Sequence, residues 1–249
     1  MSIVGTQVIL GLVQGITEWF PVSSTGHLAL AEHFLRMPED LSYDVFLHIA
    51  SLLVMIIFFR REILSLFTRT FVKPQREARA EVGYIIVTTL ITVILGLAIA
   101  PVENYFRAPV WIAAGLAVNA AVLFMVRGLN GPRSIDLRTA ILIGLVQGFA
   151  VFPSVSRSAM TISIALLMKM RRDEAFRYSF LAAMPAIAAA IVVTVPKLQW
   201  HSEFLIGFMV TALVSYTSLA VLRVIVRRDY FHWFWIYNII LAVAVLFYA

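Results

Sequence analysis

The sequence predicts an all-α polytopic membrane protein with six transmembrane helices and two re-entrant helical hairpins, arranged as inverted-topology repeats. Three observations predict this fold class: an apolar composition, a series of long apolar segments, and one motif that occurs twice. Of the 249 residues, 61% are hydrophobic and 14% are charged, whereas a soluble domain has roughly 45–50% apolar and about 25% charged residues. The composition therefore indicates an integral membrane protein.

Six apolar segments qualify as spanning helices, which need about 20 mainly apolar residues to cross the bilayer. They cover residues 42–59, 83–101, 109–126, 178–195, 204–222 and 231–249. Two further segments, 3–36 and 137–170, are each interrupted by a Pro-Ser break. Broken backbone is tolerated at membrane depth only where protein or a water-filled cavity satisfies it. Both segments are therefore expected to be re-entrant hairpins.

The two hairpin segments carry the same motif. Gly-Leu-Val-Gln-Gly occupies residues 11–15 and again 144–148. An aromatic-rich stretch follows in each copy and ends in Phe-Pro, at 20–21 and at 152–153, and polar residues come next. The repetition predicts that one membrane domain, residues 1–249, consists of two related halves.

Basic residues predict the orientation of the halves. If the segment 60–81 is cytoplasmic, sixteen of the 20 Lys and Arg residues lie inside and one, Arg157, lies within the second hairpin. The three outside are Arg36, Arg107 and Lys197. This asymmetry follows the positive-inside rule and places both termini outside the cell membrane. Each half has a hairpin and three spans, and because three is odd, the halves 1–128 and 129–249 must be inverted.

The net charge of +6 does not indicate a nucleic-acid partner. The basic residues lie in short clusters between apolar segments, as is typical of cytoplasmic loops. The chain has no cysteine, which excludes disulfides, zinc-thiolate sites and cysteine nucleophiles.

Polar residues gather at the break of the first hairpin. Gln14 and Glu18 are four residues apart and share one helix face. A carboxylate at membrane depth is a candidate functional group, although Glu18 could also only cap backbone donors at the hairpin tip. Pro21 breaks the helix, and Ser23, Ser24 and Thr25 follow as N-cap candidates, with His27 in the next helical turn. A helix N-terminus of this kind is suited to bind an anion.

The second break offers Ser154, Ser156, Arg157, Ser158 and Thr161. An arginine in the membrane interior needs an anionic partner, and its planar fork suits phosphate oxygens. The alternative partner is Glu18, in a structural ion pair. Together the two breaks predict a site for a phosphorylated, membrane-embedded molecule.

Four further polar residues lie near the predicted outer boundary: Glu32, His33, Asp44 and His48. Solvation of the loops there explains them as well as a role in the site does.

These motifs resemble those of the undecaprenyl-diphosphatase family, also called the bacitracin-resistance protein family. Its first signature, (Glu/Gln)-x-x-x-Glu followed by P-V-S-S-T-G-H, stands here as Gln14, Glu18 and residues 21–27. Its second signature, P-G-x-S-R-S-x-x-T, stands at 153–161, with Ser154 in place of the glycine. The resemblance covers essentially the whole chain.

The resemblance implies hydrolysis of a C55 polyprenyl diphosphate lipid to its monophosphate, which recycles the carrier for cell-wall synthesis. It implies a catalytic group of Glu18, Ser24, His27 and Arg157. It assigns substrate binding to Gln14, Ser23, Thr25, Ser154, Ser156, Ser158 and Thr161.

In the mechanism that the resemblance implies, Ser24 or His27 attacks phosphorus. If Ser24 attacks, His27 takes its proton. Glu18 orients His27 or binds a divalent cation, Mg²⁺ or Ca²⁺. Gln14 in place of glutamate removes one candidate metal ligand. The site is expected to open toward the extracytoplasmic side. A lipid flippase without hydrolysis remains the alternative, because inverted repeats with a midplane site also suit transport. The sequence predicts no oligomeric state.

Overall fold

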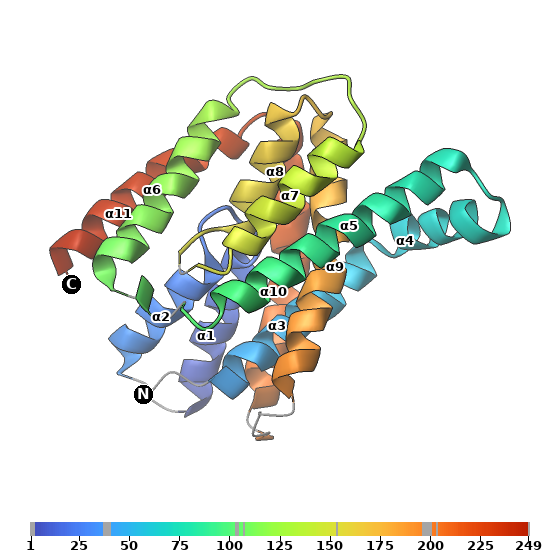
Figure 1. Cartoon of the computed structure of the whole chain (residues 1–249). Coiled ribbons are helices and arrows are strands. Elements are labelled where there is room, and N and C mark those ends of the chain that lie inside the picture. The colour runs from blue at the N-terminus through green and yellow to red at the C-terminus, as the bar shows by residue number, and fades with distance from the viewer. Residues whose placement is uncertain are drawn as a thin grey trace.

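The computed structural model describes residues 3–36, 41–102, 105–106, 108–152, 154–195, 201–202 and 204–248. The first half contains α1 (Ile3–Thr17), α2 (Ser24–Leu35), α3 (Leu41–Phe58), α4 (Arg60–Phe67), a π-helical turn (Thr68–Val72), α5 (Arg76–Ile99) and α6 (Pro109–Met125). The second half contains α7 (Leu137–Phe149), α8 (Arg157–Leu167), α9 (Arg172–Thr194), α10 (Phe204–Arg227), a 3₁₀ turn (Phe231–Trp233) and α11 (Phe234–Tyr248). Figure 1 shows these helices as one bundle. Pro153, Arg107 and Lys197 lie outside the described residues.

The helices lie where the sequence predicts them. Helices α3, α5, α6, α9, α10 and α11 match the six predicted spans, and each predicted hairpin is a helix pair, α1 with α2 and α7 with α8. By length and composition, α5, α9 and α10 can each cross a membrane. Helix α3 with its continuation through α4, bent by 62°, is a fourth candidate, whereas α6 and α11 are shorter apolar helices. The chain is thus an all-helical, multi-pass membrane protein, and the count of six spans stays a prediction.

Two helices begin earlier than the apolar pattern predicts. Helix α5 starts at Arg76 and α9 at Arg172, each about two turns before the expected span. These added turns are polar, so the apolar pattern does not predict them. An ion pair joins the added turns of the two helices, with 2.6 Å between Arg177 of α9 and the buried Glu81 of α5. The predicted loop 60–81 is mostly helical, because it contains α4 and the π-helical turn as well as the start of α5.

The two halves pack reciprocally. Helix α1, the first arm of the first hairpin, packs on α10 of the second half, while α7, the first arm of the second hairpin, packs on α5 of the first half. Helices α6 and α11, the last helix of each half, run side by side (Figure 1). Each hairpin is therefore supported mainly by the half to which it does not belong.

The repeated Gly-Leu-Val-Gln-Gly motif brings the packed helices close together. A Cβ atom at Gly11 would lie 2.8 Å from the carbonyl oxygen of Gly207 in α10. A Cβ atom at Gly144 would lie 3.0 Å from the carbonyl oxygen of Thr88 in α5. Small residues allow such close backbone approach between membrane helices. The motif thus acts in helix packing.

A threonine hydroxyl completes each of these contacts. Thr211 of α10 donates to the carbonyl oxygen of Gly11 at 3.1 Å, and Thr92 of α5 donates to that of Gly144 at 3.3 Å. Both hydroxyls are buried. The same hydrogen bond therefore recurs in the two halves, between a hairpin arm and its supporting helix.

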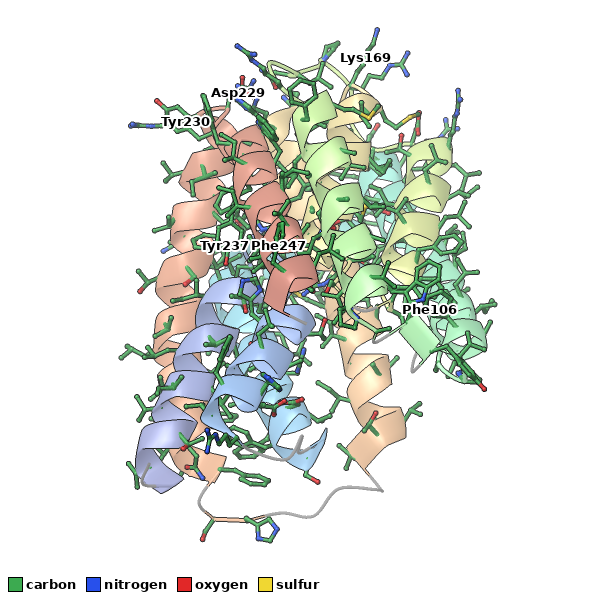
Figure 2. The ribbon with its side chains drawn as sticks, turned by 90° about the vertical axis from the view of Figure 1, so that its left-hand side faces the viewer. Phe106, Lys169, Asp229, Tyr230, Tyr237 and Phe247 are labelled. Carbon is green, nitrogen blue, oxygen red and sulfur yellow. The ribbon has the colours of Figure 1, made fainter. Side chains whose placement is uncertain are left out.

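The loops that follow α6, α8 and α10 meet at one end of the bundle, near Lys169, Asp229 and Tyr230 in Figure 2. Arg172 forms a 2.7 Å ion pair with Asp229, whose carboxylate also accepts from the backbone N–H of Gly128 at 3.1 Å. All three loops are predicted to be cytoplasmic. Their meeting at one end agrees with the predicted topology.

The tip of the first hairpin rests on the main apolar core. Trp19 is fully buried and its ring lies 5.8 Å from that of Phe180 in α9, centroid to centroid. Phe180 in turn contacts Phe176 and Phe59. This aromatic cluster holds the residue next to Glu18 in the core.

We expect Gly11→Ala to destabilise the protein, because the new methyl group would force α1 away from α10. Overpacking of this kind costs roughly 1–3 kcal/mol. The matched control is Gly83→Ala in α5, where a Cβ atom would meet nothing within 4 Å. Thermal unfolding in detergent measures both variants, and equal midpoints for the two would contradict the packing role of Gly11.

Candidate active site

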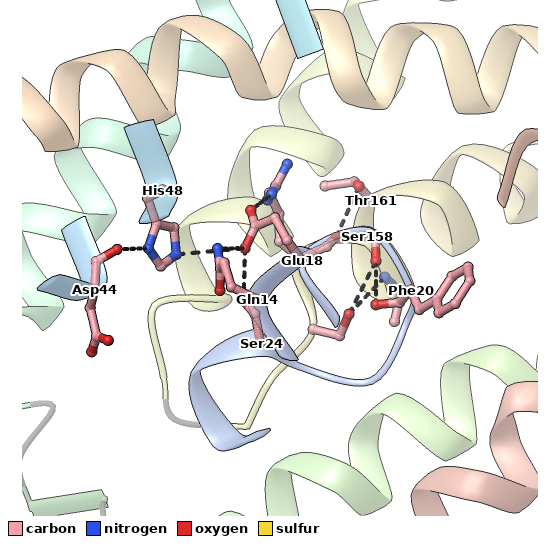
Figure 3. Close-up of polar contacts among 11 residues, drawn as sticks. Gln14, Glu18, Phe20, Ser24, Asp44, His48, Ser158 and Thr161 are labelled. Carbon is pink, nitrogen blue, oxygen red and sulfur yellow. Dashed lines mark hydrogen bonds and ion pairs between the residues drawn. The ribbon is translucent and has the colours of Figure 1, made fainter. Parts of the chain in front are cut away.

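The tips of the two hairpins lie against each other. Arg157, the first residue of α8, forms an ion pair with Glu18, which follows α1. Figure 3 shows Glu18 between Gln14, Ser24 and His48. Nearby, the Ser158 hydroxyl donates to the carbonyl oxygen of Phe20 at 3.2 Å. Both contacts join residues more than a hundred positions apart, so the site exists only where the hairpins meet.

Glu18 is buried and has polar partners on both carboxylate oxygens. Arg157 contacts Oε1. On Oε2, the Ser24 hydroxyl donates at 2.8 Å and the Gln14 amide at 3.2 Å. The Nε2 atom of His48 lies 3.5 Å from the same oxygen. Glu18 is therefore the centre of the site and not only a cap for backbone donors.

The ion pair between Arg157 and Glu18 is the alternative that the sequence left open. The Arg157 side chain is nevertheless 17% exposed. A guanidinium carries five N–H donors, and the pair with Glu18 does not use all of them. Arg157 can thus hold Glu18 and still offer donors to an anion.

The neighbouring serines of the first tip have different partners. Ser23 is the N-cap of α2 and accepts from the backbone N–H of Gly26 at 3.4 Å. Ser24 is the first helical residue, and its hydroxyl points to Glu18. In the second tip Ser156 is the N-cap of α8 and accepts from the N–H of Ala159. The two helix starts are therefore capped by Ser23 and Ser156, which leaves Ser24 available for chemistry.

His27 has partners that the sequence did not predict. Its Nδ1 lies 2.7 Å from the carbonyl oxygen of Ser23 and its Nε2 lies 2.6 Å from the hydroxyl of Tyr237 in α11. Because a carbonyl oxygen only accepts, Nδ1 carries the hydrogen, and in the neutral imidazole Nε2 then accepts from Tyr237. The two rings also stack, with an interplanar angle of 15°.

The expected contacts of His27 with Glu18 and Ser24 are absent from the described hydrogen bonds. Ser24 donates to Glu18 instead. The ring turns back toward the start of its own helix and toward α11, so the expectation that Glu18 orients His27 stays a prediction.

Most of the predicted binding residues are buried and bonded within the protein. Thr161 donates to the carbonyl oxygen of Arg157, one helical turn earlier. The buried members of the set are Gln14, Ser23, Ser154, Ser156, Ser158 and Thr161. Their positions favour a role in holding the tips, and direct contact with a substrate stays a prediction. Ser24, Thr25, His27 and Arg157 are at least partly exposed.

The backbone conformation at Ser154 explains why the family signature has a glycine at this position. Its φ is 64°, in the left-handed region that glycine adopts readily and other residues adopt at a cost of roughly 1–2 kcal/mol. Its hydroxyl is buried without a hydrogen-bond partner. The backbone turn of the second tip is therefore kept even though the glycine is replaced.

Sequence reasoning missed three residues around the site and left a fourth, His48, open between loop solvation and a role in the site. His48 faces Glu18 from α3, and Tyr237 reaches His27 from α11. Asn119 and Asn238 contact the two tips from α6 and α11. A signal for the asparagines was present, since polar residues within apolar spans are by default functional candidates.

The described residues do not form a site that holds a metal ion by itself. They contain no group of three His, Asp or Glu side chains arranged around one point. Glu18 is the one carboxylate in the described part of the two tips, and both of its oxygens already have partners. Binding of a divalent cation at Glu18 therefore stays a prediction.

The fold and site together define a class of protein: a multi-pass helical membrane protein with an acid, a serine, a histidine and an arginine at the meeting point of two broken hairpins. A family model described as bacitracin resistance protein BacA matches residues 7–244. The chain belongs to this family.

Relatives of similar length carry one name. A Korarchaeum cryptofilum protein called undecaprenyl-diphosphatase is 34% identical, over 96% of this chain and 97% of its own. Proteins of the same name from Elusimicrobium minutum and Gemmatimonas aurantiaca are 33% and 36% identical, each over 96% of this chain and 95% of their own.

The hydrogen bond between Tyr237 and His27 can be tested without a substrate. In Tyr237→Phe, Nε2 loses its donor while the Nδ1 bond to Ser23 remains. We expect the ¹⁵N NMR signal of His27 Nε2 to move to the position of an unbonded imidazole nitrogen. Tyr216→Phe, in which an exposed α10 tyrosine loses its hydroxyl, is the control. An unchanged signal in Tyr237→Phe would exclude the bond.

Proposed function

We propose that the protein hydrolyses undecaprenyl diphosphate to undecaprenyl phosphate and inorganic phosphate, and so recycles the carrier lipid of cell-wall synthesis and confers bacitracin resistance. The names of its relatives support this activity. The observation that carries the proposal is the contact of Arg157 with the Glu18–Ser24 pair. It joins an anion-binding group to an acid and a hydroxyl, the groups that phosphoryl transfer needs.

The proposed architecture is an inverted repeat of residues 1–128 and 129–249, each with a re-entrant hairpin and three spans. The reciprocal packing of α1 on α10 and of α7 on α5 supports it. The meeting of the basic loops at one end supports a cytoplasmic location of that end. In this arrangement both termini are extracytoplasmic, and the hairpin tips open toward the outer leaflet of the plasma membrane.

Substrate binding uses charge and helix ends together. The diphosphate takes the free donors of Arg157, and the backbone N–H groups at the starts of α2 and α8 face its oxygens. These donors are fixed before the reaction begins, so they stabilise the charge that develops on phosphorus in the transition state. The polyprenyl tail stays in the lipid.

Ser24 is the proposed nucleophile. Its hydroxyl already donates to Glu18 at 2.8 Å, whereas the Nε2 atom of His27 is bonded to Tyr237 at 2.6 Å and would first have to lose that bond. As Ser24 Oγ attacks the terminal phosphorus, its proton passes to Glu18 and undecaprenyl phosphate leaves. Water then attacks the phosphorus of the phosphoserine, Glu18 returns its proton to Ser24 Oγ as that oxygen leaves, and inorganic phosphate is released with the protons of the water.

Binding of the diphosphate prepares Glu18 for this step. In the substrate-free structure the charge of Arg157 is paired with Glu18. When phosphate oxygens bind the free donors of Arg157, their negative charge weakens the attraction between the guanidinium and Glu18, and Glu18 becomes a better acceptor for the Ser24 proton. The same arginine thus binds the substrate and controls the base.

Phosphate release by purified protein in detergent tests the assignment. Ser24→Ala and Glu18→Gln are expected to lower kcat by roughly 10²–10⁴-fold, since general base catalysis contributes about this factor. Arg157→Lys is expected to raise KM as well, because the fork geometry is lost. Ser163→Ala, a buried α8 serine without a hydrogen-bond partner, is the matched control.

Two outcomes would overturn parts of the proposal. Full activity of Ser24→Ala together with loss in His27→Ala would make His27 the nucleophile. A wild-type protein that is folded and binds the lipid but releases no phosphate would favour lipid transport.

The divalent cation stays a prediction, with Mg²⁺ or Ca²⁺ as candidates. Because Gln14 is uncharged and Glu18 is already bonded, we propose that the cation arrives on the diphosphate, in the way Mg²⁺ is often held mainly by substrate phosphates. Electron paramagnetic resonance with Mn²⁺ as the probe should detect no stoichiometric binding to the substrate-free protein. Tight binding that Glu18→Gln abolishes would instead indicate a resident site.

A further inference from the structure

Two asparagines in neighbouring helices are fully buried. Asn119 lies in α6 and Asn238 in α11, and each has 0% of its surface exposed. The Nδ2 group of Asn119 donates to the Oδ1 atom of Asn238 at 3.2 Å. An amide pair in the membrane interior is expensive unless its hydrogen bonds are complete.

The pair completes its hydrogen bonds with the hairpin tips. Asn119 donates to the carbonyl oxygen of Ser154 and accepts from the N–H of Ser156, both at 2.8 Å. Asn238 donates to the carbonyl oxygen of Pro21 at 2.8 Å and to that of Phe234, in its own helix, at 2.9 Å. All four amide N–H groups of the pair are therefore used.

The bonded backbone groups lie in equivalent places of the two tips. Pro21 precedes Ser24 by three residues, and Ser154 precedes Arg157 by three residues. Each carbonyl belongs to the stretch where a hairpin leaves its first helix and has not yet begun its second. Such backbone groups need a protein partner at membrane depth, and the two asparagines supply it.

We propose that Asn119 and Asn238 act as one positioning unit that sets the separation between Arg157 and Ser24. This inference rests on the proposed roles of Arg157 and Ser24 in phosphate binding and attack. The asparagines are positioning residues, because they bond the tip backbones and do not contact the reacting side chains in the described structure.

Because both asparagines belong to the α6–α11 pair, this helix pair determines how the two tips lie relative to each other. These two helices pack closely along each other, so the asparagines hold both tips to one rigid support. A displacement of one hairpin against the other would break at least one buried hydrogen bond. The site is therefore preassembled before the substrate arrives, and a misplacement of about 1 Å can cost roughly 10²-fold in rate.

Kinetics of Asn119→Leu and Asn238→Leu test the unit. We expect kcat to fall by up to about 10²-fold while KM changes little, because Arg157 itself is intact. The double variant should lose about as much as the worse single variant, as residues acting as a unit do. Thr211→Val is the control: it removes another buried hydrogen bond to the first hairpin, at Gly11 instead of the tip.

A distance measurement tests the same unit without a substrate. The chain has no cysteine, so spin labels can be placed at Phe34→Cys, at the exposed end of α2, and at Lys169→Cys, just after α8. The distribution of distances between the labels should be narrow in the labelled protein without further substitutions and in its Thr211→Val variant. It should broaden in both asparagine variants.

The outcomes separate this inference from the proposed activity. Folded asparagine variants with full kcat, strictly additive losses, or unchanged distance distributions would each overturn the positioning unit. Absence of phosphate release from the parent would overturn the activity, and the distance result would still decide the role of the asparagines. If the leucine variants do not fold, Asn119→Ser and Asn238→Ser remove the same backbone contacts with a smaller polar side chain.

Discussion

The structure depends on one ion pair, between the buried Glu18 and the partly exposed Arg157. A charge at membrane depth is expensive, and removing one partner of a buried pair leaves the other uncompensated. The two residues come from different hairpins, 139 positions apart. The hairpin tips must therefore meet for either charge to be tolerated, and the remaining polar contacts of the site are arranged around this meeting point.

The support of the tips is nearly symmetric, but their chemistry is not. In both halves a glycine-rich arm packs on a helix of the other half, with a threonine bonded to the arm backbone. Gln14 then donates to Glu18, whereas Gln147, its counterpart in the second motif, donates to Thr92. The difference follows from the residue four positions later, which is Glu18 in the first hairpin and Val151 in the second.

The first residues of α2 and α8 show the same division. Ser24 begins one helix and Arg157 begins the other, each directly after a capping serine. One tip thus supplies the acid and the hydroxyl, and the other supplies the cation. Neither hairpin carries all of these residues, so the site needs both tips.

Sequence alone determined much of this molecule, because the relevant signals are local. The lengths of the apolar segments predict where the helices lie, and Pro21 with the serines after it predicts the first break. Charged residues are rare in such an apolar chain, which makes Glu18 and Arg157 candidates for the site. The capping role of a serine after each break also follows from local backbone chemistry. The early starts of α5 and α9 were missed, since their polar first turns are stabilised by a partner on the other helix.

Only the tertiary structure decided which side chains meet. His27 is bonded to Tyr237, 210 positions away, and no pattern along the chain relates the two. Asn119 and Asn238 could be recognised as polar residues in apolar spans, but their bonds to Pro21 and Ser154 depend on how α6 and α11 pack. The sequence fixes the residue types that an anionic lipid site needs, while helix packing assigns their partners, because contacts between helices depend on three-dimensional distance and not on spacing along the chain.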